Sequence, residues 1–175
     1  MPTTKTKIKK TVVCFVCTGN TCRSPVAERL FKSYLKKEGK NQKFRVFSLG
    51  LMAFEGKPMS IHSQTVLKNN KIPHSNHKAK ILSERIKKTT DFFVCMTQDH
   101  ENALLESLKS GVESKAKVVS IKTITGGTDV VDPYGGKLED YANMYTYVEY
   151  AMQDVLKYIE IENNNKIIKE ETNKW

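Results

Sequence analysis

Short apolar runs alternate with longer stretches of helical periodicity along this chain. Residues 11–16 form a continuous β-rich apolar run, which is typical of a strand buried on both faces of a parallel sheet. After it the period changes, and apolar residues recur at helical spacing until Gly39 ends the helix; they are Val26, Ala27, Leu30, Phe31, Tyr34 and Leu35. We expect Ser24 to cap this helix and Pro25 to occupy its first position.

The same alternation continues toward the C-terminus. We predict three further strands, at residues 44–49, 91–96 and 116–121. Helices are predicted at 60–69, 82–88 and 98–109, and a Gly-containing loop at 125–137. A long last helix presents one apolar face, formed by Leu138, Tyr141, Ala142, Tyr145, Val148, Met152, Val155 and Ile159. Strands separated by helices predict an α/β fold with a parallel sheet covered on both faces. Ligands of such sheets bind beyond the carboxyl ends of the strands.

Composition is that of one globular domain. Hydrophobic residues make up 39% of the 175 residues and charged residues 27%, so a chain of this length buries a sizeable core. We assign residues 11–161 to the domain and expect the polar flanks, 1–10 and 162–175, to be frayed or disordered. No apolar run approaches the roughly 18 residues of a membrane span. The N-terminus lacks the apolar stretch of a secretory signal, so we expect a cytoplasmic protein with no membrane partner.

The formal net charge of +10 attracts anions in general. The lysines are scattered, however, and aromatic residues do not interleave with them. This pattern is typical of a solvated lysine-rich surface, and we expect no nucleic-acid partner. A positive field also favours phosphorylated protein substrates. The sequence indicates no oligomeric state.

The chain has four cysteines. Three of them, Cys14, Cys17 and Cys22, fall within nine residues, and the fourth is Cys95. Such a cluster is no disulfide framework of a secreted domain, and in a cytosolic chain it indicates catalysis or metal binding. A metal site needs further ligands at suitable spacing. The histidines do not supply them, so we expect neither a metal nor a cofactor; they are His62, His74, His77 and His100.

The segment from Cys17 to Pro25, Cys-Thr-Gly-Asn-Thr-Cys-Arg-Ser-Pro, connects the first strand to the first helix. A short loop in that setting turns its backbone N–H groups inward and forms an anion nest with the helix N-terminus. We expect Gly19 to provide the conformational freedom for the curl and Arg23 to bind phosphate oxygens with two parallel N–H donors. A cysteine in this field is expected to have a depressed pKa and to act as a nucleophile in phosphoryl transfer. The hydroxyl of Ser24 can further stabilise its thiolate. The alternative is a buried structural Cys17 with a salt-bridging Arg23.

A proton donor for the leaving group is the second requirement. Asp132 lies in the long loop before the last helix, and Pro133 stiffens the chain beside it. The loop is long enough to carry the carboxyl over the phosphate site. The same pair is equally compatible with a plain turn.

These two motifs resemble those of the low-molecular-weight protein tyrosine phosphatase family. The likeness extends over residues 11–160, and Asp132, Pro133 and Tyr134 follow the first motif at the usual separation. The resemblance implies a Rossmann-like, four-stranded parallel sheet and a phosphocysteine intermediate, with Cys17 as nucleophile and Asp132 as acid. It also implies that Asn20 holds the loop in shape by hydrogen bonds. We expect the whole loop to bind phosphate through Thr18, Gly19, Asn20, Thr21, Cys22, Arg23 and Ser24.

Two positions bear on the substrate. Typical phosphotyrosine members carry an aliphatic residue where this chain has Thr21, and two tyrosines where it has Tyr134 and Gly135. Both departures resemble the bacterial protein-arginine phosphatase branch of the family. A threonine hydroxyl can orient a guanidinium leaving group or a water, and Tyr134 can stack on either flat substrate. We therefore lean slightly toward phosphoarginine and keep phosphotyrosine open, since Thr21 is also a neutral isostere.

The remaining cysteines divide into two kinds. Cys22 is close enough in the loop to form a reversible disulfide with Cys17, which would protect or switch off the nucleophile, and the resemblance supports this. Cys14 and Cys95 lie in predicted central strands and are expected to be core residues.

Two other functions are compatible with parts of this sequence. Arsenate reductases of the same family need a redox cysteine pair after the second strand, and residues 51–91 contain no cysteine. A catalytically silent phospho-binding module would lack one of the reactive residues, yet Cys17, Arg23 and Asp132 are all present. The sequence therefore predicts a cysteine-dependent protein phosphatase.

Overall fold

A four-stranded parallel sheet forms the centre of the molecule, as the sequence predicts. The computed structural model describes residues 9–172. The strands are β1 (Thr11–Cys17), β2 (Phe44–Gly50), β3 (Phe92–Cys95) and β4 (Lys117–Ser120), in the spatial order β2-β1-β3-β4. Strand β1 pairs with both β2 and β3, which makes it a central strand. Its side chains are buried on both faces of the sheet, Val13 and Phe15 on one and Cys14 and Val16 on the other. This explains why residues 11–16 are apolar without alternation.

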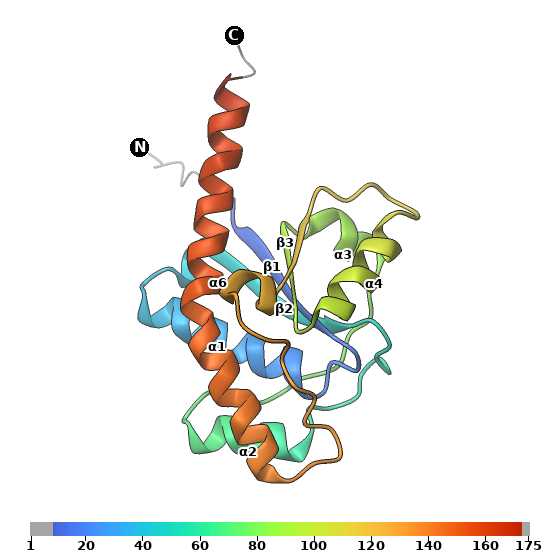
Figure 1. The fold of residues 1–175 in the computed structure, drawn as a ribbon, viewed down its shortest axis with the longest axis vertical. Coiled ribbons are helices and arrows are strands. Elements are labelled where there is room, and N and C mark those ends of the chain that lie inside the picture. The colour runs from blue at the N-terminus through green and yellow to red at the C-terminus, as the bar shows by residue number, and fades with distance from the viewer. Residues whose placement is uncertain (1–8, 173–175) are drawn as a thin grey trace, which may run out of the picture.

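Helices cover both faces of the sheet (Figure 1). On one face lie α1 (Arg23–Lys37), α2 (Ile61–Asn69), α5 (Ile121–Thr125) and α6 (Leu138–Thr172), packed over Val13 and Phe15 of β1. On the other lie α3 (Glu84–Thr89) and α4 (Gln98–Leu108). Cys14 and Cys95 are fully buried on this second face, which confirms them as core residues. A single 3-10 turn, η1 (Asn41–Lys43), precedes β2.

Two local predictions are wrong: the end of the fourth strand at residue 121, and the start of the first helix with Ser24 as its cap. Strand β4 ends at Ser120 because the Ser120 hydroxyl caps α5, accepting from the backbone N–H of Thr123. Helix α1 begins two residues before the expected first position, with Cys22 at its N-cap and no side-chain cap. Ser24 therefore lies inside the helix, which frees its hydroxyl for other partners.

The polar C-terminal segment is also not disordered as expected. Helix α6 continues to Thr172, and its last turns project past the sheet (Figure 1). Contacts to the sheet hold the extension in place: Glu162 pairs with Lys117 at 2.6 Å, and the Asn163 amide donates to the Thr11 hydroxyl at 3.1 Å. At the other end, the expected N-terminal extension lies outside the described residues as far as residue 8. No helix within residues 9–172 combines the length and the apolar composition needed to cross a membrane.

Candidate active site

The first motif lies at the carboxyl end of β1, as the parallel-sheet argument predicts. Cys17 is the last residue of β1 and Arg23 the first of α1. The loop between them lines a cavity of about 220 Å³. Loop residues, the segment after β2 and the loop before α6 all contribute to this cavity: Cys17, Thr18, Gly19, Thr21, Cys22, Arg23, Met52, Phe54, Lys57, Asp132 and Tyr134.

Neighbouring segments donate hydrogen bonds to the backbone carbonyl groups of the loop. The carbonyl oxygens of Cys17 and Thr18 accept from the backbone N–H groups of Leu51 and Met52, each at 2.9 Å. Further along, the carbonyl of Thr21 accepts from Ser60 N–H at 2.9 Å, and the carbonyl of Asn20 accepts from the His77 ring at 2.7 Å. With these acceptors engaged, the arrangement suits an anion nest.

Asn20 rather than Gly19 takes the unusual backbone conformation of the loop. Its φ is +53°, in the left-handed region, whereas Gly19 has no positive φ. The Asn20 amide donates to the hydroxyls of Ser24 at 2.8 Å and Ser48 at 2.9 Å, and its oxygen accepts from Lys80 N–H at 2.9 Å. These bonds confirm that Asn20 holds the loop in shape. They also correct the expectation that Gly19 supplies the curl.

Gly50 supports the loop from behind, which sequence reasoning missed. It ends β2 beside Cys17 in the sheet register. A Cβ atom here would lie 2.5 Å from the carbonyl oxygen of Thr18 and 2.8 Å from the nitrogen of Asn20. Since backbone cannot yield as a flexible side chain does, only glycine fits under the loop.

A buried carboxylate continues this support. Ser48 donates to Glu28 at 2.6 Å, and Lys32 pairs with the same side chain at 2.5 Å. Burial raises the pKa of Glu28, but Lys32 and the hydrogen bond from Ser48 outweigh it and hold this pKa below its ordinary value. Glu28 is therefore ionised at neutral pH and keeps Ser48 oriented toward Asn20.

Cys17 lies at the bottom of the cavity, only 2% exposed. Its sulfur is 2.9 Å from the Ser24 hydroxyl and accepts from the Asn20 N–H at 3.3 Å. Burial raises the pKa of the Cys17 thiol, and the hydrogen bond from Ser24 and the charge of Arg23 offset this only in part. The expectation of a depressed pKa is thus wrong for this arrangement, because removal from water disfavours the thiolate more than these contacts favour it.

Arg23 and Asp132 meet although 109 residues separate them. The guanidinium donates through Nη2 to the Asp132 carboxylate at 2.8 Å and to the Thr18 hydroxyl at 3.3 Å. The Arg23 side chain is 7% exposed, against 48% for Asp132. The loop before α6 therefore carries the carboxyl to the mouth of the cavity, beside the loop between Cys17 and Arg23.

The cavity mouth is rimmed by exposed apolar side chains. Tyr134 is 73% exposed there, and its backbone N–H donates to Asp132 at 3.2 Å. Met52 and Phe54, on the segment after β2, are 76% and 78% exposed. Sequence reasoning missed these two because they lie outside both motifs, and unusual exposure of large apolar residues is their only signal. Thr21 lines the same cavity.

Cys22 also lines the cavity and is buried. Its sulfur lies 3.5 Å from the Ser60 hydroxyl and 3.6 Å from the Tyr141 hydroxyl. Burial and then the contact with Cys22 raise the pKa of Tyr141 to about 12. All four cysteines are free thiols in this structure, so a Cys17–Cys22 disulfide stays a prediction.

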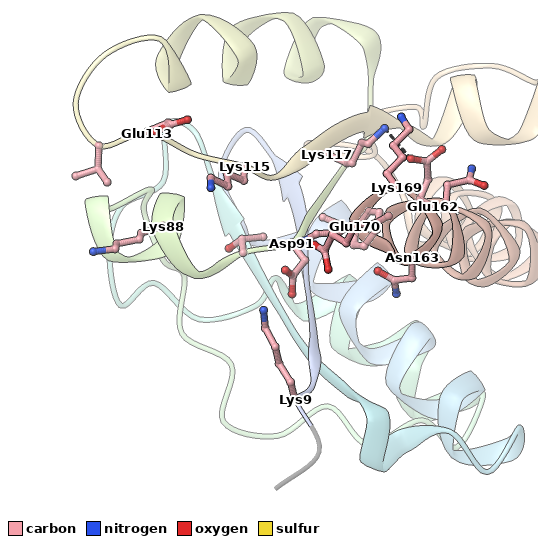
Figure 2. Close-up of a pocket in the computed structure, with 15 residues that line it drawn as sticks. Lys9, Lys88, Asp91, Glu113, Lys115, Lys117, Glu162, Asn163, Lys169 and Glu170 are labelled. Carbon is pink, nitrogen blue, oxygen red and sulfur yellow. Dashed lines mark ion pairs between the residues drawn. The ribbon is translucent and has the colours of Figure 1, made fainter. Parts of the chain in front are cut away.

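A larger cavity, of about 730 Å³, opens at the other end of the sheet (Figure 2). Positively charged lysines and negatively charged carboxylates line it, among them Lys9, Asp91, Lys115 and the Lys117–Glu162 pair at 2.6 Å. Its described lining contains no cysteine. Across residues 9–172, no group of three or more His, Cys, Asp or Glu side chains is placed to hold a metal ion.

The chain matches one family of known proteins over most of its length. Residues 12–166 match the model of the low molecular weight phosphotyrosine protein phosphatase family. A protein-arginine-phosphatase of Bacillus subtilis is 33% identical over 147 residues, which cover 83% of this chain and 94% of that protein. A low molecular weight phosphotyrosine protein phosphatase of Gallus gallus is 30% identical over 136 residues, covering 76% of this chain and 85% of the other.

Solved structures share the fold. A YwlE mutant of Bacillus subtilis superposes with a TM-score of 0.78 at 31% identity, covering 86% of this chain and 99% of the other. A structure of a YwlE arginine phosphatase mutant with a phosphorylated active-site serine has a TM-score of 0.77 at 32% identity, covering 85% of this chain and 95% of the other. In that relative, a side chain of the active site carries the phosphate.

Proposed function

Because this chain belongs to the low molecular weight phosphotyrosine protein phosphatase family, whose members are cysteine-dependent phosphatases, we propose that Cys17, Arg23 and Asp132 are its catalytic residues. The observation that carries the proposal is their convergence on one cavity of about 220 Å³, with Arg23 bonded to Asp132 at 2.8 Å. A nucleophile, an anion-binding cation and a proton donor in one site are what phosphate-ester cleavage requires.

In the first step the Cys17 thiolate attacks phosphorus, and an S–P bond forms as the bond to the leaving atom breaks. Asp132, protonated at this stage, gives its proton to that atom, which leaves neutral. Arg23 and the loop N–H groups stabilise the charge that collects on the equatorial oxygens. For this the guanidinium turns part of its donors from Asp132 to the phosphate, which frees the carboxyl to face the leaving group.

In the second step a water molecule attacks the phosphocysteine. Asp132, now a carboxylate, accepts a proton from that water, and the S–P bond breaks to release phosphate and the thiolate. Phosphorylated protein side chains are the substrates. A free thiol nucleophile needs a reducing compartment, which supports the expected cytoplasmic location.

We take phosphoarginine as the preferred substrate. Thr21 lines the cavity, and its hydroxyl suits a polar guanidinium better than an apolar phenyl ring. The protein-arginine-phosphatase of Bacillus subtilis supports this choice at 33% identity. Phosphotyrosine is the second candidate, because the exposed aromatic rings of Phe54 and Tyr134 at the mouth can stack on a phenyl ring.

The test is kcat/KM on a phosphoarginine peptide and a phosphotyrosine peptide of the same sequence, with Cys17→Ser as the blank. We expect Cys17→Ser to lose turnover but to bind inorganic phosphate, since the loop remains. Turnover by Cys17→Ser would overturn the mechanism. A higher kcat/KM for the phosphotyrosine peptide would overturn the substrate preference and leave the mechanism intact.

A further inference from the structure

His100 connects α4 to the phosphate loop through two short hydrogen bonds. It lies in the first turn of α4 and is 8% exposed. Its Nδ1 is 2.8 Å from the hydroxyl of Thr97, and its Nε2 is 2.8 Å from the hydroxyl of Thr18. Both ring nitrogens are therefore engaged, and the ring is held between the helix cap and the loop.

Thr18 passes this restraint on to the catalytic arginine. Its hydroxyl oxygen accepts from Arg23 Nη2 at 3.3 Å, and the same nitrogen donates to Asp132 at 2.8 Å. An unbroken chain of hydrogen bonds thus extends from α4 to the acid loop. The hydrogen bonds in such a chain polarise one another, so a hydroxyl that is bonded on one side forms a stronger hydrogen bond on the other.

The ring is in its neutral form. Burial, together with the positive charge of Arg23, lowers the pKa of His100 to about 4. A neutral imidazole has one N–H and one acceptor nitrogen, so it donates to one threonine and accepts from the other. It therefore orients the Thr18 hydroxyl without placing a second positive charge beside Arg23.

We propose that His100 is a positioning residue for the phosphatase reaction, which acts through the Thr18 hydroxyl to hold the Arg23 guanidinium between the phosphate site and Asp132. This inference rests on the proposed function of the same site. His100 lies outside both sequence motifs and touches neither Cys17 nor Asp132 in any hydrogen bond of the described residues. Its effect is transmitted by geometry, since Arg23 carries several rotatable bonds that need fixed partners.

The experiment is a double-mutant cycle with Thr18→Val and His100→Phe in the full chain. Two quantities are measured: kcat/KM on the better of the two peptides, and the affinity for inorganic phosphate in the Cys17→Ser background. Each single substitution is expected to lower both quantities roughly 10- to 100-fold, the range for a hydrogen bond to a charged group. The double variant is expected to be no worse than Thr18→Val alone, because His100 acts through that hydroxyl.

Three further variants separate positioning from a structural role. Thr18→Ser restores the hydroxyl and is expected to recover most of the phosphate affinity. His100→Gln keeps one polar end toward Thr18, is expected to lose less than His100→Phe, and repeats the cycle if the phenylalanine variant does not fold. Thr90→Val removes a buried hydroxyl at the opposite end of the sheet, where it donates to the Ile86 carbonyl at 2.7 Å. This control is expected to change the melting temperature but not the phosphate affinity.

Additive losses in the cycle would overturn the proposal, as would unchanged phosphate affinity in folded His100→Phe and His100→Gln. The two proposals fail in different ways. If turnover of the wild-type chain did not depend on Cys17, the proposed function would fall, while the phosphate-affinity cycle would still decide whether His100 positions Arg23.

Discussion

The hydroxyl oxygen of Ser24 lies 2.9 Å from the sulfur of Cys17. The same hydroxyl accepts from the Asn20 amide at 2.8 Å and lies 3.2 Å from the Leu49 carbonyl, to which it can donate. Its single hydrogen therefore has two acceptors, the carbonyl and the sulfur. When Cys17 ionises, the hydrogen turns to the thiolate, so Ser24 stabilises the reactive form specifically.

Ser24→Ala is expected to move the acid limb of the kcat/KM profile to higher pH. Cys17 must be deprotonated to react, so activity falls as the pH drops below its pKa. The hydrogen bond from Ser24 lowers that pKa, so removing it raises the pKa and shifts the limb upward. At a pH on this limb, the rate is expected to fall about tenfold or more. Ser114→Ala, which removes a hydroxyl bonded to the Lys87 carbonyl far from the site, should leave the profile in place. A limb that does not move in Ser24→Ala would exclude this role.

Asp132→Ala is expected to slow substrates with poor leaving groups most. A positioned general acid contributes about 10²- to 10⁴-fold, and a leaving group that departs readily as an anion needs it least. The measurement is kcat for a series of aryl phosphates of falling leaving-group acidity. Asp129→Asn is the matched control, since Asp129 lies in the same loop but caps α4 by accepting from Gln98 N–H at 2.9 Å. Equal slowing across the series would assign the acid to another group.

Thr21→Ile is expected to shift preference toward phosphotyrosine. Isoleucine adds apolar surface to the cavity wall and removes the hydroxyl, which favours a phenyl ring over a guanidinium. The readout is the ratio of kcat/KM for the two peptides. Thr21→Ser keeps the hydroxyl and should keep the preference for phosphoarginine. If both variants give the wild-type ratio, Thr21 does not select the substrate.

Gly50→Ala and Gly19→Ala are expected to have opposite consequences for the loop. At Gly50 the added carbon would lie 2.5 Å from the Thr18 carbonyl oxygen, so the phosphate loop must shift. We expect Gly50→Ala to lose phosphate affinity and at least tenfold in kcat/KM, because small displacements of binding groups are costly. At Gly19 the nearest atom is the Thr21 hydroxyl at 3.7 Å, an ordinary contact, so Gly19→Ala should keep the wild-type melting temperature. Normal activity in Gly50→Ala would show that the loop tolerates the shift.

Much of the architecture could be predicted from the chain alone. The apolar run of β1 and the helical spacing of α1 and α6 depend on neighbours in sequence, so period and composition identify them. The extension of α6 to Thr172 could not be predicted, because it is held by Thr11 of β1 and Lys117 of β4, which are distant from it in the sequence. The contact of the Ser24 hydroxyl with Cys17 agrees with the expectation from the loop. Its contacts with Asn20 and Leu49, in place of a helix cap, could not be predicted because they depend on how the loop and β2 pack together.

The sequence by itself determined the position of the site, since Cys17 and Arg23 lie six residues apart at the junction of a buried strand and a helix. Only the tertiary structure decided what surrounds them. Gly50 and His100 have no local signature, and they reach the loop because parallel strands bring their carboxyl ends to one edge of the sheet. The tertiary structure also decided the direction of the pKa shift of Cys17, because the burial that raises this pKa depends on how the whole fold packs around the sulfur.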